Sequence, residues 1–140
     1  DTRRKDYRQL DWVLSDRDPI RHWSKGRVTL LGDAAHPTLQ TLAQGACMAI
    51  EDAVCLAELI DLANGDFARA FRQYESARYL RTARVQLESR YLWDNFYHLG
   101  GIEREVARAA WAERGEAQIF ECLAWLYDGF SVPDRISEAA

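Results

Sequence analysis

The sequence lacks the features that would assign it directly to a membrane, secreted or nucleic-acid-binding class. None of its apolar runs approaches the roughly 20 residues that span a bilayer. No apolar segment follows the charged residues at its start, so neither a transmembrane segment nor a signal peptide is predicted. An initiator methionine is also missing, which predicts that the natural chain begins upstream. The net charge is −4 at pH 7, and a mildly acidic chain has no general attraction for nucleic acid.

Lysine and cysteine are both scarce. The arginines, which outnumber the lysines, are interspersed with Glu and Asp along helical stretches, a pattern typical of solvated helix faces. Cys47, Cys55 and Cys122 are odd in number and show no C-x-x-C spacing, so neither a disulfide framework nor a metal site is predicted. This usage favours a reducing compartment, and we expect a cytoplasmic protein. The apolar context of each cysteine predicts a small buried side chain.

What is present predicts one folded domain that is mostly helical. Hydrophobic residues make up 48% of the 140 positions and charged residues 29%, which fits a globular chain. Residues 10–14 and 27–32 are predicted to form short strands. Four helices are predicted after them, from Gly45 to a stop at Asn64-Gly65, from a cap at Asp66 to about His98, and over 102–113 and 116–127. The fold class is therefore an α/β fragment, mostly α, with a loose polar tail after Gly129.

The second predicted strand and the helix after it indicate which neighbouring elements the fold must contain. The segment 27–32 is apolar and β-branched, so it is predicted to be a buried strand with neighbours on both sides. An isolated pair of strands is not stable, which predicts that the chain is part of a larger fold. In the helix that follows, apolar residues recur at helical spacing and predict one core-facing side, formed by Ala46, Ala49, Ile50, Ala53, Leu56, Ala57 and Ile60.

The residues most suggestive of chemistry lie between the second strand and the first helix. Asp33 directly follows the strand. The helix starts with the small residues Gly45, Ala46 and Cys47. Free backbone amides and the helix dipole favour negative charge at such a start, and small residues let a ligand approach. The alternative is an ordinary strand–loop–helix connection whose small residues only allow close packing.

The run Gly32-Asp33-Ala34-Ala35-His36-Pro37, followed by Gln44-Gly45 and by Glu51-Asp52-Ala53, resembles the second FAD-binding motif of class A flavoprotein monooxygenases, the single-component aromatic hydroxylases. The resemblance implies FAD as cofactor, NADH or NADPH and O2 as co-substrates, and an aromatic small molecule as substrate. It also implies the C-terminal part of a 4-hydroxybenzoate-hydroxylase-like FAD-binding fold. Residues 1–26 would end the substrate-domain sheet, 27–65 would carry the FAD motif, and 66–140 would form a C-terminal helical region.

The resemblance assigns roles residue by residue. Asp33, after Gly32, matches the aspartate that contacts the ribityl chain of FAD, and Pro37 matches the proline that shapes the loop beside the flavin ring. The remaining matches, at the helix start that offers backbone amides to the flavin, are Gln44, Gly45, Ala46 and Cys47. Many relatives carry Asn at the position of Cys47, and a thiol hydrogen-bonds poorly. His36 is either a structural histidine or a catalytic one, and Asp52 is expected to tie its helix to its surroundings.

Gln40 is the candidate catalytic residue. Gln40 and the segments 16–20, 43–53 and 123–127 resemble the 3-hydroxybenzoate 6-hydroxylase branch of the family. Many other family members have proline at the position of Gln40. An amide both donates and accepts, so Gln40 could hold the substrate hydroxyl, with Leu39 and Leu42 flanking the ring. The alternative is a solvated loop residue. The expected reaction is 3-hydroxybenzoate to gentisate, with a salicylate or hydroxynicotinate hydroxylase as alternatives.

Two other readings of the chain stay open. A non-catalytic helical interaction module would use the long helix as a docking surface, and a flavin-dependent halogenase or oxidase would share the FAD motif. No G-x-G-x-x-G occurs in the sequence, so we expect the 140 residues alone neither to bind FAD tightly nor to turn over. The long helix and the family together suggest a homodimer.

Overall fold

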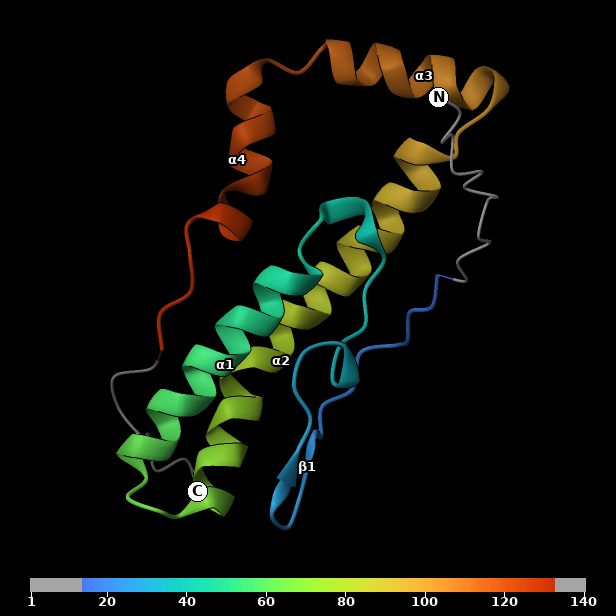
Figure 1. The fold of residues 1–140 in the computed structure, drawn as a ribbon. Helices are drawn as coiled ribbons and strands as arrows, with labels where there is room; N and C mark the ends of the chain where they lie inside the picture. Colours follow the sequence, from blue (N-terminus) through green and yellow to red (C-terminus); the bar gives the residue numbers. More distant parts are fainter. Residues whose placement is uncertain (1–13, 133–140) are drawn as a thin grey trace, which may run out of the picture.

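The computed structural model describes residues 14–132, in which two short strands precede four α-helices (Figure 1). The strands β1 (Ser24–Lys25) and β2 (Val28–Thr29) form an antiparallel hairpin, with Ser24 opposite Thr29. Gly26 has a φ of 62° in the turn between them, a conformation that glycine adopts without strain. The mostly helical fold predicted from the sequence is confirmed. The strand predicted at 10–14 falls outside the described residues, except for Leu14, which has no regular structure.

The strand predicted over 27–32 is shorter than expected and is not buried. Only Val28 and Thr29 are in β2, and Val28 is 65% exposed. Within the described residues β2 pairs only with β1, for which no strand was predicted. Gly32, with a φ of 58°, then turns the chain into the 3-10 turn η1 (Gly32–Ala34). The predicted length was therefore wrong, while the exposure of Val28 agrees with the expectation that this strand needs neighbouring strands that the sequence does not supply.

The two central helices agree closely with prediction. The first, α1 (Gly45–Leu62), is followed by a turn at Asn64 and Gly65, both with positive φ. The second, α2 (Phe67–Leu92), begins where the Asp66 carboxylate accepts a hydrogen bond from the backbone N–H of Arg69 at 3.0 Å. It continues into a π-helical turn, η3 (Trp93–Tyr97), and so ends near His98 as expected. The two helices lie side by side along most of their length (Figure 1).

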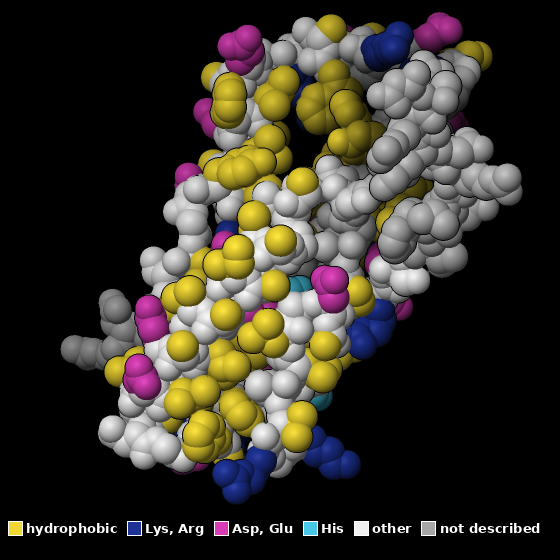
Figure 2. All heavy atoms as spheres, viewed as in Figure 1, with side chains coloured by type: hydrophobic (Ala, Val, Ile, Leu, Met, Phe, Trp, Pro, Cys, Tyr) yellow, Lys and Arg dark blue, Asp and Glu magenta, His cyan; other side chains and the backbone are white. Residues whose placement is uncertain are grey.

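The core-facing side of α1 differs from the prediction. The buried residues are Met48, Asp52, Cys55 and Leu59, whereas Ile50 on the expected face is 65% exposed. Helix α1 is apolar on nearly every side, so its sequence periodicity could not identify the side that meets α2. Figure 2 shows hydrophobic side chains along the exposed surface of α1.

Two clusters of buried side chains form the core. The larger lies between α1, α2 and the segment before the hairpin, and its buried members are Trp23, Ala35, Cys55, Leu59, Ala63, Ala70 and Tyr74. The smaller joins the start of α1 to the C-terminal helix through Met48, Val85 and Leu126. The smaller cluster therefore includes a residue from the start of α1, and the larger includes residues from its second half.

The last two helices differ in burial, because only the second of them contributes a buried residue, Leu126, to the core. Helix α3 (Gly101–Ala112) crosses beyond the end of α2, and α4 (Glu116–Tyr127) returns toward α1 (Figure 1). No residue of α3 is buried. The tail expected to be loose is packed as far as it is described, because Phe130 and Val132 contact the larger cluster. None of the helices within residues 14–132 is both long enough and apolar enough to cross a membrane.

Candidate functional site

An open groove of about 580 Å³ lies between η1, the loop 38–43 and the start of α1. Its lining residues are Leu31, Gly32, Asp33, Thr38, Leu39, Gln40, Ala43, Gly45, Ala46 and Ala49. The groove thus brings together six predicted site residues, Gly32, Asp33, Leu39, Gln40, Gly45 and Ala46. Four others, Pro37, Leu42, Gln44 and Cys47, do not line it. Residues from both predicted sets, cofactor and substrate, therefore share one groove.

Gly32 makes the turn that aims Asp33 at the groove. Its φ of 58° strains any residue with a side chain, and a Cβ there would stand 3.1 Å from the Cβ of Ala49. The buried Gly32 N–H donates to Oδ2 of Asp52 at 3.1 Å, which fixes the turn. Asp33 follows as an exposed residue, and Gly45 faces it: a Cβ on Gly45 would lie 3.9 Å from Oδ1 of Asp33.

The start of α1 is open toward the groove. Among the described residues no side chain caps it, so the amides of its first turn are unsatisfied by the protein. Ala43, with a φ of 53° that is rare for residues other than glycine, brings the loop around so that Gly45 begins the helix. Ala46 and Cys47 are exposed there. An uncapped helix start with small residues and a nearby carboxylate fits a ligand that carries both an anionic group and hydroxyls.

The cysteines do not share one environment. Cys55 is buried, and burial raises the pKa of its thiol to about 11. Cys47 and Cys122 are exposed free thiols, so the prediction that each would be buried was wrong for these two. Cys47 sits on the first turn of α1, where the helix has no covering element within the described residues.

The two leucines predicted to flank a substrate lie on opposite sides of their loop. Leu39 lines the groove beside Gln40, whose side chain is exposed. Leu42 packs against the smaller core cluster instead and lines a different pocket. Leu39 has an extended backbone just before the 3-10 turn η2 (Gln40–Leu42), whereas Leu42 is the last residue of that turn, so the two side chains do not follow one helical spacing.

A buried carboxylate lies directly behind the groove. Asp52 accepts from the Gly32 N–H, lies 2.6 Å from Nε2 of His36, and accepts from Nε of Arg78 at 2.7 Å. Burial raises the pKa of Asp52, but the hydrogen bonds from His36 and Arg78 outweigh it and hold the pKa below its usual value. His36 is 2% exposed and its Nε2 atom contacts the Asp52 carboxylate, an arrangement that fits the structural alternative. Asp52 ties α1 to the turn, as expected.

Two arginines extend this network to the C-terminal helix. Arg78 also reaches Glu51 at 2.6 Å, and Arg81 binds Glu51 at 2.8 Å while donating to the carbonyl of Trp125 at 2.7 Å. Burial raises the pKa of Glu51, but the two guanidinium groups lower it by more, so the pKa stays below its usual value. Arg78 is fully buried, so the reading of the arginines as solvated helix faces was wrong for this one. Its sequence context, Ala77 and Tyr79, gave no signal of burial.

Helix α2 also holds the loop of the groove. The buried Gln86 donates from Nε2 to the carbonyl of Pro37 at 2.9 Å, and Thr41 Oγ1 donates to the carbonyl of Ser89 at 2.7 Å. The Arg17 guanidinium donates to the carbonyl of Ala35 at 2.6 Å, on the other flank of the same segment. Neither Gln86 nor Ser89 could be identified from the sequence, because both bind backbone or hydroxyl groups far away in the chain.

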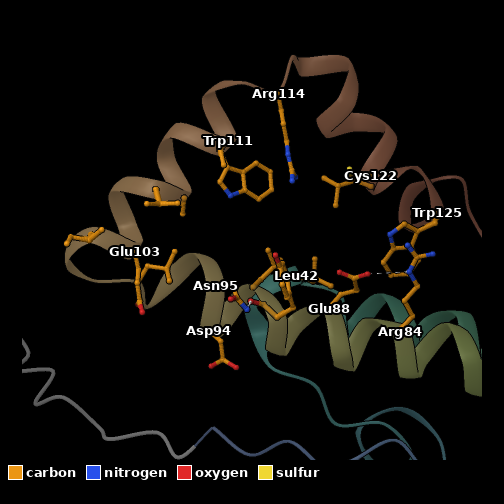
Figure 3. Close-up of a pocket in the computed structure, with 18 residues that line it drawn as sticks. Leu42, Arg84, Glu88, Asp94, Asn95, Glu103, Trp111, Arg114, Cys122 and Trp125 are labelled. Carbon is orange, nitrogen blue, oxygen red and sulfur yellow. Dashed lines mark hydrogen bonds and ion pairs between the residues drawn. The ribbon is translucent and has the colours of Figure 1, made fainter.

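A larger pocket of about 990 Å³ opens between α2, α3 and α4 (Figure 3). Trp111 extends into it from α3, Arg114 from the turn that follows α3, and Trp125 from α4. Its two arginines make cation–π contacts with aromatic rings. The guanidinium carbon of Arg84 lies 3.8 Å from the ring centroid of Trp125, and that of Arg114 lies 4.8 Å from the ring centroid of Trp111. The pocket also contains Glu88, Asp94 and Glu103, so its charge is mixed, and Leu42 is the one predicted site residue in it. The smaller groove is therefore the candidate site.

Comparison with known proteins gives a consistent result. A family model described as FAD binding domain matches residues 5–88. The chain is 50% identical over 127 residues to 3-hydroxybenzoate 6-hydroxylase of Polaromonas naphthalenivorans, covering 91% of this chain and 31% of that protein. It is 51% identical over 76 residues to 6-hydroxynicotinate 3-monooxygenase of Bordetella bronchiseptica, covering 54% and 20%.

A solved structure agrees with these sequence matches. Klebsiella pneumoniae HpxO, complexed with FAD and uric acid, superposes with a TM-score of 0.68 at 32% identity, covering 79% of this chain and 29% of that one. The chain thus spans about a third of the length of its relatives, 31% in the case of the Polaromonas protein.

Proposed function

The chain belongs to the FAD-binding-domain family of class A aromatic hydroxylases, and on that basis we propose that its groove forms part of the FAD and substrate site of an NAD(P)H-dependent monooxygenase. The proposed substrate is a hydroxybenzoate-type acid, with conversion of 3-hydroxybenzoate to gentisate as the preferred reaction. The observation that carries the proposal is that Asp33, Gly45 and Gln40 line one groove. An interaction module would not need such an arrangement.

The cofactor part of the proposal uses the open start of α1. FAD, when bound, would take a hydride from NAD(P)H and activate O2. The Asp33 carboxylate would accept hydrogen bonds from hydroxyls of the ribityl chain. The amides of Gly45, Ala46 and Cys47 would donate to the pyrimidine edge of the flavin, where the helix dipole favours negative charge. Gln44 and Pro37 would shape the groove from behind.

The substrate part uses the loop beside that helix. Gln40 would hydrogen-bond the phenol hydroxyl of the substrate and favour loss of its proton, because an amide oxygen can accept that hydrogen bond. Leu39 would contact the ring and help to exclude water. Leu42 faces the smaller core cluster and would support the loop instead of contacting the ring.

The deciding experiment uses the natural-length protein with FAD, NADH, O2 and 3-hydroxybenzoate. We expect gentisate, identified by chromatography, to form in step with loss of NADH. Oxidation of NADH that yields only hydrogen peroxide would reject the substrate, and 6-hydroxynicotinate and salicylate would then be tested. Absence of both bound flavin and NADH loss would reject the enzyme and favour the interaction module, while a different product class would favour a halogenase or oxidase.

A pair of glutamine variants tests Gln40 within that assay. Gln40→Ala should lower kcat/KM for the aromatic substrate by about 10- to 100-fold, since loss of a hydrogen bond to an ionising group costs about 1.5–3 kcal/mol. Gln118→Ala, an exposed change on α4 far from the groove, is the matched control. Equal kinetics for the two variants would remove Gln40 from the proposal.

Three accompanying proposals concern the wider protein. We expect a homodimer, which light scattering of the natural-length protein would check, and a cytoplasmic location, which cell fractionation would check. We also expect residues 1–140 alone to bind FAD weakly and to show no turnover, because the sequence lacks a G-x-G-x-x-G segment for the ADP half of the cofactor. A stable flavin spectrum and NADH oxidation by these residues alone would contradict the last expectation.

A further inference from the structure

Gln40 sits in a short loop that is anchored to α2 on both sides of it. Before Gln40, the side-chain amide of Gln86 donates from Nε2 to the carbonyl of Pro37 at 2.9 Å and to that of Arg17 at 2.8 Å. Gln86 is 1% exposed, so removal of its amide would leave both carbonyls without a partner. One buried side chain therefore fixes the start of the loop.

After Gln40, the anchor is the hydroxyl of Thr41. It donates to the backbone carbonyl of Ser89 at 2.7 Å, and Thr38 adds a 3.1 Å hydrogen bond to the Ser89 side chain. Ser89 is fully buried and lies about one helical turn beyond Gln86, so both anchors belong to the same face of α2. The side chain of Gln40, between them, is left exposed in the groove.

A hydrogen bond elsewhere on α2 provides a useful contrast. The hydroxyl of Thr82 donates to the carbonyls of Arg78 at 3.1 Å and Tyr79 at 3.3 Å, within the helix itself. The Thr82 side chain is 1% exposed, like that of Gln86, and neither of these hydrogen bonds reaches the loop. Loss of the Thr82 hydroxyl would affect stability alone, whereas loss of an anchor would also free the loop.

Resting on the proposed function, we propose that Gln86 and Thr41 are positioning residues that set the place of Gln40 in the groove. With either anchor lost, the loop can shift, and the aromatic substrate is held less tightly and in more than one orientation. More NAD(P)H is then oxidised without hydroxylation, because its hydride and a proton reduce O2 to hydrogen peroxide. The two residues thus act on the reaction through Gln40 without touching the substrate.

The kinetic test compares four variants of the natural-length, FAD-loaded protein. Thr41→Val and Gln86→Met remove one anchor each, Thr41→Ser keeps the hydroxyl, and Thr82→Val is the matched control. The anchor variants should raise KM for 3-hydroxybenzoate about five- to tenfold, the equivalent of one net hydrogen bond. They should also lower the gentisate formed per NADH, while Thr41→Ser and Thr82→Val keep both values. An anchor variant that matches Thr82→Val in both readouts overturns the proposal.

A second measurement does not depend on activity. Hydrogen exchange of the amides in 38–43, followed by mass spectrometry, should be faster in both anchor variants than in the wild-type protein and Thr82→Val. Unchanged exchange overturns the anchoring, whether or not the protein hydroxylates anything. Lack of hydroxylation by the wild-type protein counts against the proposed function instead, and should Gln86→Met fail to fold, Thr41→Val alone decides.

Discussion

The Nε atom of Arg78 lies 2.7 Å from Oδ1 of Asp52, and both side chains are completely buried between α1 and α2. Forming such a pair removes two charges from water, so the pair adds little net stability, but loss of one partner is costly because it leaves the other charge uncompensated. The pair joins the helix that begins at the groove to the helix that anchors its loop. Through the N–H of Gly32, the same carboxylate also fixes the turn before Asp33.

Asp52→Asn should lower the free energy of unfolding by about 3–5 kcal/mol, because Arg78 would keep its charge with only the partly exposed Glu51 to balance it. Denaturation of the natural-length protein by urea measures the change. Asp61→Asn, at an exposed position on the same helix, is the control and should change stability little. A loss for Asp52→Asn no larger than for the control would show that the pair is not needed.

Acid should destabilise the protein through the same groups. Burial raises the pKa values of Glu51 and Asp52, but hydrogen bonds with the arginines and with His36 lower them more, to below the ordinary 4.5 and 3.8. The unfolded chain therefore binds more protons between the lowered and the ordinary pKa values, so this stability is present above about pH 4.5 and is lost as pH falls through that window. Thermal unfolding from pH 7 to pH 3 should show a smaller acid effect in Asp52→Asn. Parallel curves for the two proteins would argue against a lowered pKa.

Two glycines near the groove should respond differently to alanine. Gly32→Ala should cost about 1–2 kcal/mol, because alanine resists its left-handed backbone, and the methyl group would also crowd Ala49. A methyl group on Gly45 meets nothing closer than 3.6 Å, so Gly45→Ala should fold normally but obstruct the helix start and weaken FAD binding. Melting temperature and flavin fluorescence titration measure the two effects. Normal FAD affinity in Gly45→Ala would place the flavin elsewhere.

The three thiols should differ in reactivity. Cys55 is buried and burial raises its pKa to about 11, so it should be alkylated at pH 8 roughly 100-fold or more slowly than the exposed Cys47 and Cys122. Peptide mapping after iodoacetamide treatment follows each site. Bound FAD should slow Cys47 and leave Cys122 unchanged. Protection of Cys122, or none at Cys47, would count against the proposed groove.

Local signals explain what could be predicted from the sequence. The end of α1 and the start of α2 were predicted correctly because local residues decide them: Asn64 and Gly65 adopt a positive φ, and Asp66 caps α2. The run from Gly32 to Pro37 identified the family for a similar reason, since its residues are contiguous and their types are restricted. Such features need no knowledge of distant parts of the chain.

Features that depend on distant contacts could not be predicted. Arg78 has the same kind of neighbours as the exposed arginines, and its partner Asp52 lies on another helix. Likewise, α1 is apolar on nearly every side, so only the position of α2 determines that Cys55 is buried and Ile50 is exposed. The packing of Leu42 against the smaller core cluster likewise depends on a loop shape that the sequence does not encode locally.

The two loop anchors end on main-chain oxygens, those of Arg17, Pro37 and Ser89. Every amino acid offers the same oxygen, so these anchors place no demand on which side chain occupies the three acceptor positions. The donors have no such freedom, because position 86 needs a long side chain with two N–H groups and position 41 needs a hydroxyl. Selection on the anchors themselves therefore acts on Gln86 and Thr41, while any restriction on side chains at the acceptor positions comes from their other contacts, such as the hydrogen bond from Arg17 to the carbonyl of Ala35.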